Sequence, residues 1–225
     1  IGVRLVGSEM CIRDREFSLM KARLEIYYEN IPANALRLFE SKYAENPSDA
    51  NLYGLALAYK KNNNFNEGLA SLDKLLEKYP KNLVLNTTKV EFLSYFNKFN
   101  DALDLANKFL EISPKNYPLS ISKSQILLNM GQYFESEEII RDQLLRKNDS
   151  PDLWFMLSET QKTSQNIVGY HQSRAEYFLL LGQDEKALNQ LEFALQLTQN
   201  NFQVSDRIMT KTVSYTHLRA HETYT

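Results

Sequence analysis

The sequence predicts an all-α protein, a right-handed superhelical solenoid of about 10 to 11 antiparallel helices. Three observations lead to this fold class. Apolar residues recur at i, i+3, i+4 and i+7, the spacing of one face of an amphipathic helix. The helical pattern repeats at a constant period, and each repeat keeps a small residue at the same place in its second helix. A single helical hairpin of this kind would expose an apolar face to water, so the hairpins must stack.

The clearest repeat occupies residues 49–82 and reads as two helices joined by a polar turn. The turn contains Asn62, Asn63 and Asn64, because asparagine tolerates left-handed backbone. Pro80 ends the repeat, since proline cannot continue a helix. The apolar stripe of the first helix and the inner face of the second contain Leu52, Leu55, Ala56 and Tyr59, then Gly68, Leu72 and Leu75.

Pro80 and Pro114 end successive copies, and the interval between them is the period of tetratricopeptide repeats, so the chain resembles proteins of that class. The second helix of each copy must approach the first closely. Position 20 of the repeat therefore accepts only a small residue. Gly68, Ala102 and Ser136 occupy that position.

The register of the repeat sets the predicted boundaries. Pro32 is expected to open the second helix of the first unit, where a missing N–H costs nothing. Residues 167–181 keep step with the pattern on both sides and are predicted to form one helix shared by two overlapping units. The predicted units span residues 16–48, 49–82, 83–116, 117–150 and 151–201, and a closing helix covers 202–211.

Both ends of the chain are excluded from these units. Residues 1–15 fit neither a helical period nor a signal peptide, because Arg4 and Glu9 interrupt any apolar segment. They resemble translated sequencing-adapter read-through, and residues 213–225 resemble the same kind of artefact. We therefore expect the native chain to span residues 16–212.

Composition excludes several classes of function. Lys and Arg number 26 against 28 Asp and Glu, a net charge of -2, so nucleic acid is not a predicted partner. No apolar run reaches the roughly 18 to 20 residues that a membrane-spanning helix needs. The seven glycines form no phosphate-binding loop pattern. Cys11 is the only cysteine, and a native segment without cysteine suits an oxidising compartment but is equally common by chance.

A more specific resemblance is carried by three stretches, "RAEYFLLLGQDEKALNQLEFALQLTQNNFQ" at 174–203, "LYGLALAY" at 52–59 and "EFSLMKARL" at 16–24, together with the shared helix. With these the chain resembles the C-terminal repeat domain of bacterial periplasmic zinc metalloproteases, the group that contains the beta-barrel assembly-enhancing protease. The resemblance implies a periplasmic location, and partners among outer-membrane assembly machinery or its substrates. It also implies a zinc-binding H-E-x-x-H in a separate catalytic domain. This sequence contains no such motif, so the resemblance transfers no catalytic residue and no zinc ligand to it.

The remaining candidates for chemistry have simpler interpretations. His171 is the only histidine of the expected native segment and is more simply a structural or solvent-facing residue than a ligand. His217 and His221 have helical metal-pair spacing, but Leu218 replaces the glutamate of H-E-x-x-H. The acidic residues Glu137, Glu138 and Asp142 read as a solvated helix face rather than as an acid–base pair. The sequence therefore predicts no catalytic residue, metal site or cofactor within this chain.

A stack of such repeats offers a groove lined by fixed positions of each first helix, and we expect proteins or peptides to bind there. Tyr53 and Tyr95 could anchor a partner through large contact area and a hydroxyl group, or could pack against the neighbouring repeat. The carboxylate clamp of chaperone-tail receptors needs Lys and Asn where Tyr53 and Leu57 stand, so that ligand class is disfavoured. The predicted groove residues are Tyr53, Lys60, Lys61, Thr87, Glu91, Tyr95, Ile121 and Gln125. The alternative to a protease fragment is a free-standing repeat scaffold or assembly factor without enzymatic activity.

Overall fold

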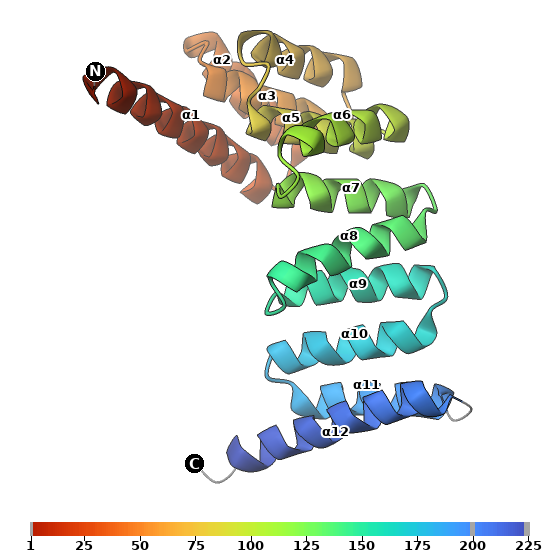
Figure 1. Ribbon diagram of the computed structural model, residues 1–225. Coiled ribbons are helices and arrows are strands. Elements are labelled where there is room, and N and C mark those ends of the chain that lie inside the picture. Colours follow the sequence, from red (N-terminus) through yellow and green to blue (C-terminus); the bar gives the residue numbers. More distant parts are fainter. Residues whose placement is uncertain (1, 199–200, 223–225) are drawn as a thin grey trace. The chain divides into compact units, whose positions relative to one another are not determined.

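The structure is a computed structural model that describes the backbone of residues 2–198 and 201–222 and the side chains of residues 14–198 and 201–214. Twelve helices and no strand occupy this described part of the chain (Figure 1). The predicted all-α class is confirmed, with twelve helices rather than about 10 to 11. The helices are α1 (Gly2–Tyr28), α2 (Pro32–Glu45), α3 (Asp49–Lys61), α4 (Phe65–Lys78), α5 (Leu83–Tyr95), α6 (Phe99–Ile112), α7 (Tyr117–Asn129), α8 (Tyr133–Arg146), α9 (Pro151–Thr163), α10 (Ile167–Leu180), α11 (Asp184–Leu197) and α12 (Phe202–Glu222).

The two terminal helices differ most from the prediction. Helix α1 begins at Gly2, so residues 2–15 are helical although no helical period was found there. An established helix extends readily, since each added residue costs much less than nucleation, and no proline interrupts this segment. Helix α12 likewise extends past residue 211 to Glu222. The side chains of Cys11, His217 and His221 lie outside the described residues, and the assignment of both ends as artefacts stays a prediction.

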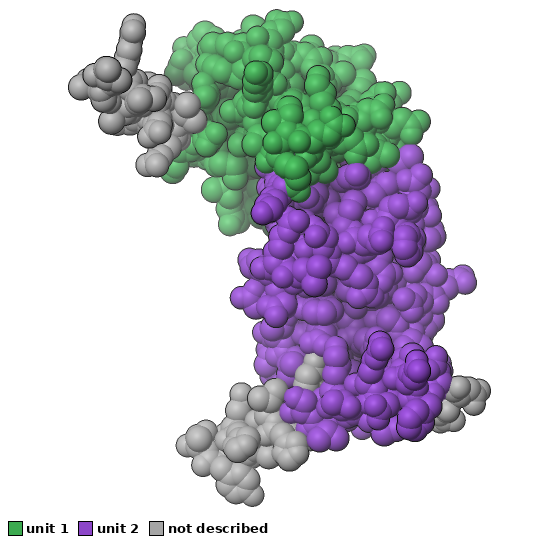
Figure 2. Space-filling model, in the orientation of Figure 1, with its two compact units in different colours: residues 1–114 green, residues 115–225 purple. Residues whose placement is uncertain are grey.

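The chain divides into two compact units, Ile1–Pro114 and Lys115–Thr225, coloured separately in Figure 2. In the first unit α3 is central, because α1, α2 and α4 all pack against it, and α5 packs against α4 and α6. In the second unit each helix from α7 to α11 packs against the next one along the chain, and α12 packs against α11. Both arrangements are stacks of antiparallel helices, as the repeat predicts.

The turns inside the helical hairpins share one backbone conformation. Asn63, Asn97, Gly131 and Gln165 have φ values of 61°, 58°, 78° and 62°, and they occupy the same position in four successive repeats. Gly182 also has a positive φ, 66°, but follows Gln165 by only half a repeat. Asparagine and glycine adopt left-handed backbone at little cost. The turn therefore keeps the period of the repeat even where the residue type changes.

The starts of the first helices also repeat. Ser48, Asn82 and Asn116 each accept a backbone hydrogen bond from the residue three positions later, at 3.3, 2.9 and 3.0 Å. These N-caps are again spaced by one full repeat, and each satisfies one of the free N–H groups at a helix start. Pro32 stands at the first position of α2, as predicted.

The small residues at position 20 are fully enclosed. Gly68, Ala102 and Ser136 are all buried, and a Cβ atom at Gly68 would lie 2.6 Å from the ring of Phe92 and 3.2 Å from Cβ of Tyr59. Tyr59 belongs to the same hairpin, whereas Phe92 belongs to the next one. Close approach at this position therefore serves the contact between hairpins as well as the contact within one.

Helix α10 forms a helical hairpin with the helix before it and another with the helix after it. It packs against α9 and against α11, and the flanking turns contain the left-handed residues Gln165 and Gly182. Its buried Ala175 belongs to a core with Ala187, Leu191 and Ala194 of α11. The division of this region into two overlapping units is a proposal that these contacts fit.

Candidate functional site

One pocket in the first unit gathers aromatic, aliphatic and cationic side chains, and has a volume of about 440 Å³. Helix α1 supplies its residues from the last two turns, α3 supplies its C-terminal half, and α5 supplies its final residue. Three helices thus meet around one concave surface. The lining residues are Arg23, Ile26, Tyr27, Leu57, Lys60, Lys61 and Tyr95.

Lys61 closes the end of α1. Its ammonium group donates hydrogen bonds to the carbonyl oxygens of Ile26, at 2.8 Å, and Glu29. A helix C-terminus leaves such carbonyl groups without partners and carries partial negative charge, so a lysine there is stabilising. Lys61 is therefore already engaged within the unit and holds α1 against α3.

Arg23 of α1 forms an ion pair with Glu91 of α5. Both side chains are about one-third exposed, at 32% and 28%. This pair joins two helices that are far apart in sequence. It also neutralises the only predicted groove residue that is acidic.

Lys60 differs from the other two cations. Its ammonium group lies 5.2 Å from the centre of the Tyr95 ring, a cation–π arrangement. Burial lowers the pKa of Lys60, the charge of Glu91 opposes this, and the charge of Arg23 adds to it. The Tyr95 hydroxyl group donates to Oδ1 of Asn63 at 3.0 Å, which fixes the ring at the pocket rim.

Two predicted groove residues, Tyr53 and Thr87, lie in the core instead, as does Leu57. Tyr53 is 0% exposed, Leu57 is 6% exposed and Thr87 is 6% exposed, so neither Tyr53 nor Thr87 can contact a partner, and Leu57 reaches only the floor of the pocket. The sequence interpretation assumed that each first helix buries one apolar face and exposes the other. Helix α3 instead packs against α1, α2 and α4 and is buried at every residue from Leu52 to Ala58. Of the two interpretations of Tyr53, packing against the neighbouring repeat is the one that the structure supports.

The other predicted groove residues belong to α7 of the second unit. Ile121 is half-buried and packs against the core formed by Ile140, Leu144, Leu153 and Leu157. Gln125 is exposed and donates to Oδ1 of Asn129, one turn later on the same helix, at 3.2 Å. Within its own unit, Gln125 is therefore accessible and Ile121 is mainly structural.

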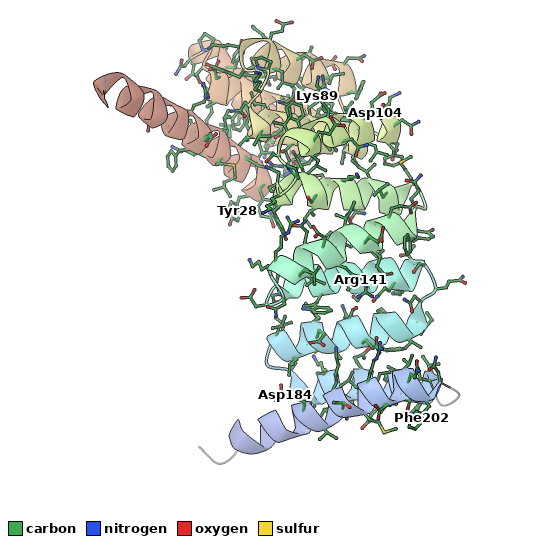
Figure 3. The ribbon with its side chains drawn as sticks, viewed as in Figure 1. Tyr28, Lys89, Asp104, Arg141, Asp184 and Phe202 are labelled. Carbon is green, nitrogen blue, oxygen red and sulfur yellow. The ribbon has the colours of Figure 1, made fainter. Side chains whose placement is uncertain are left out.

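Sequence reasoning missed the contribution of α1. Tyr27 and Tyr28 stand in the first repeat where Lys60 and Lys61 stand in the second, so the same positional rule would have found them. Both are 73% exposed, their rings meet edge to face at 5.2 Å, and Tyr28 is labelled in Figure 3. Arg23 stands in the first repeat where the buried Ala56 stands in the second, and no pattern in the sequence indicates its pairing with Glu91.

The second unit shows what the candidate chemical residues do. Nδ1 of His171 lies 2.8 Å from Oε1 of Gln190, which fits the structural interpretation of this histidine. Glu137 is not simply solvated, because Oε1 accepts hydrogen bonds from Arg141 and from Gln161 of α9; Figure 3 labels Arg141. Asp142 pairs with Arg146 at 2.8 Å.

Among the described residues, no group of three or more His, Cys, Asp or Glu side chains is placed to hold a metal ion. None of the helices, as far as the structure describes them, is long and apolar enough to cross a membrane.

The repeated hairpins, with their regularly spaced turns and caps, define the tetratricopeptide-repeat class of fold. The sequence matches no protein-family model and no curated protein sequence. Solved structures therefore provide the comparison, and they show similarity of fold at low sequence identity.

PilW, described as a widely conserved type IV pilus biogenesis factor, has a TM-score of 0.61 and 16% identity, with 93% of this chain and 94% of that chain covered. A tetratricopeptide repeat protein from Parabacteroides merdae has a TM-score of 0.52 and 16% identity, covering 81% of this chain and 78% of that one. The tetratricopeptide protein TTC0263 from Thermus thermophilus has a TM-score of 0.51 and 20% identity, covering 87% and 97%.

Proposed function

We propose that this chain is a protein-interaction module that holds a peptide segment of a partner in the pocket of the first unit. The carrying observation is the pocket itself, with an apolar floor, an exposed Tyr27 and a fixed Tyr95 ring at its rim. Exposed tyrosines beside a cavity supply contact area with little loss of side-chain entropy. An open surface pocket on a stack of repeats suits an extended peptide, since the repeats present concave binding surfaces.

Peptide display against the full chain tests this function. We expect enriched peptides whose affinity falls by about tenfold when Tyr27 is changed to alanine, since such a loss corresponds to about 1.4 kcal/mol. Lys108→Ala, on the surface of α6, serves as a matched surface change that leaves affinity unaltered. Peptides that bind equally well to both variants would place the binding site elsewhere and refute the proposal.

More specifically, we propose that the module is the repeat domain of a periplasmic zinc metalloprotease for outer-membrane protein assembly and quality control. The stretch at 174–203 and the shared helix α10 motivate this, through their resemblance to that group. In such a protein the zinc ligands would lie in another domain, and this domain would hold partners near it. Reading the genomic frame for the two or three hundred codons upstream of Glu16, on the order of one catalytic domain, tests the assignment. The absence of H-E-x-x-H there would overturn it.

A free-standing repeat scaffold or assembly factor is the second candidate. Its motivation is PilW, a type IV pilus biogenesis factor by description, of which this chain covers 94%. This candidate predicts a signal peptide or a lipidation cysteine shortly upstream of Glu16 and no protease motif. The same genomic reading therefore separates the two.

A further inference from the structure

The three cations of the pocket differ in whether they have a partner. Arg23 is paired with Glu91, and Lys61 donates to the carbonyl groups of Ile26 and Glu29. Lys60 forms no hydrogen bond or ion pair with any residue whose side chain the structure describes, and its nearest defined contact is the ring of Tyr95. Of the three, Lys60 is therefore the cation without a protein acceptor among the described residues.

This free ammonium group lies in an unfavourable place for the protein alone. Lys60 is half-buried by α3 and by the rings and aliphatic chains around it, and partial burial of a cation without a hydrogen-bond acceptor costs free energy. The charge of Glu91 acts on Lys60, but this carboxylate is paired with Arg23. The carboxylate of Glu29 is also engaged, because it accepts from the backbone of Ile31 at 2.9 Å. Neither carboxylate thus serves as an acceptor for Lys60 in the described part of this unit, and an anionic ligand would supply one.

The rest of the pocket accepts an apolar group. Ile26 and Leu57 form a buried floor, at 8% and 6% exposure. Tyr27 and Tyr95 stand at the rim with 73% and 49% of their surface exposed. A volume of about 440 Å³ lies within the range of small-ligand sites and accommodates one large side chain. The charge and the shape of the pocket are therefore complementary to a ligand that has an anionic group next to an apolar group.

We propose that the pocket binds an internal acidic segment of a partner protein, with an aspartate or glutamate carboxylate on Lys60 and an adjacent aromatic side chain between Tyr27 and Tyr95. The proposal rests on the proposed function and names the partner chemistry of that site. Charge complementarity supports it, since three cationic residues line the pocket and the carboxylate of Glu91, which is paired with Arg23, offsets only that cation. In this proposal Lys60 is the one residue that binds the carboxylate. The carboxylate can therefore belong to an internal Asp or Glu side chain, and a two-residue clamp for a chain terminus is not required.

Two unlabelled probes test the inference on the full chain by NMR titration. Both are acetylated and amidated heptapeptides, Gly-Ser-Glu-Phe-Asp-Ser-Gly and its Gln and Asn counterpart. We expect the acidic probe to shift backbone amide signals around Tyr27, Lys60 and Tyr95, and to bind about tenfold more tightly than the neutral probe. Lys60→Met should bring the two affinities within about twofold, while Lys108→Met keeps the difference.

The outcomes separate the inference from the function on which it rests. Equal binding of both probes at the pocket, or an unchanged preference in Lys60→Met, overturns the acidic specificity and leaves the binding module intact. Failure of the acidic probe to shift the pocket signals also overturns it. If display-selected peptides fail at the pocket as well, the proposed function itself falls. A probe with a free C-terminus that binds only through that terminus would likewise contradict an internal segment.

Discussion

The phenol of Tyr53 on α3 donates a hydrogen bond of 2.8 Å to Oγ1 of Thr88 on α5. The direction follows from Thr88, whose own hydroxyl proton is used in a bond of 2.8 Å to the carbonyl group of Val84. Both side chains are buried, at 0% and 1% exposure. This bond is therefore a polar link inside an apolar core, where its partners have no access to water.

Removing either side of this link is expected to destabilise the first unit unequally. Tyr53→Phe should lower the free energy of unfolding by about 1 kcal/mol, the net value of one hydrogen bond. Thr88→Val should cost more, about 1–3 kcal/mol, because it leaves a buried phenol without an acceptor. Urea denaturation of both single variants and the double variant measures this as a double-mutant cycle. Additive losses would show that the two hydroxyl groups are not coupled.

The neighbouring lysines of the pocket should respond in opposite ways to loss of charge. Lys60→Met is expected to leave the free energy of unfolding unchanged within about 0.5 kcal/mol or to raise it, because the ammonium group is half-buried without a protein acceptor among the described residues. Lys61→Met should lower it by about 1–2 kcal/mol, since the carbonyl groups at the end of α1 lose their donor. Thermal and urea unfolding of the two variants provide the comparison. A larger loss for Lys60→Met would mean that the enclosed charge is satisfied within the protein.

Lys60 should also give the folded chain a pH dependence. Because burial lowers the pKa of Lys60 in the folded state, the unfolded chain binds more protons between that lowered pKa and the ordinary lysine value of about 10.4. The free energy of unfolding attributable to Lys60 therefore rises with pH in this window, and below it both states carry the proton. The difference in stability between the natural chain and Lys60→Met, followed from neutral to alkaline pH, measures it. A difference that stays constant with pH would contradict the lowered pKa.

The left-handed turn positions predict a stabilising substitution. Gln165 has a φ of 62° at the place where Gly131 stands one repeat earlier. A glutamine in this region is strained by about 1 kcal/mol, so Gln165→Gly should raise the free energy of unfolding by about 0.5–1 kcal/mol. Gly131→Gln should lower it by a similar amount. As a control, Gln172→Gly inside α10 should destabilise by about 1 kcal/mol, because glycine disfavours a helix interior. A loss of stability in Gln165→Gly would mean that its side chain contributes more than the strain costs.

The close approach at Gly68 predicts that the usual benefit of alanine in a helix is reversed. Its added Cβ would lie 2.6 Å from the ring of Phe92, which is itself fully buried and packed near Phe65 and Phe96. Gly68→Ala should therefore lower the free energy of unfolding by about 1–3 kcal/mol instead of raising it. In a Phe92→Leu background the same change should cost less, because a smaller side chain leaves room. An equal cost in both backgrounds would assign the effect to the backbone.

The sequence predicted the register of the repeat correctly, but it predicted only in part which side chains are exposed in the groove. The period of the repeat, the small residue Gly68, the opening of α2 at Pro32 and the polar turn through Asn63 are local features with fixed spacing, so they can be recognised in a single chain. Burial of Tyr53 could not be recognised, because helical periodicity does not tell how many neighbours a helix will have.

The candidate pocket was predicted only in part. Lys60, Lys61 and Tyr95 were found from their repeat positions, and the structure brings them together in one pocket. Their different roles depend on long-range pairing, since Lys61 meets residues 32 and 35 positions away and Arg23 meets Glu91 across 68 positions. No periodic pattern encodes such pairs, so they become visible only when the helices are packed.

The left-handed turns on both sides of α10 mean that a single helix, and not a helical hairpin, separates two turns of the same conformation. Gln165 and Gly182 are separated by half of the spacing found between the earlier turns, so residues 166–182 comprise one helix and one complete turn. Their removal would join α9 to α11 through an unchanged type of turn and would reverse the direction in which every later helix runs. The stack would then be one helix shorter, with α11 in the place of α10 and with α12 still packed against α11.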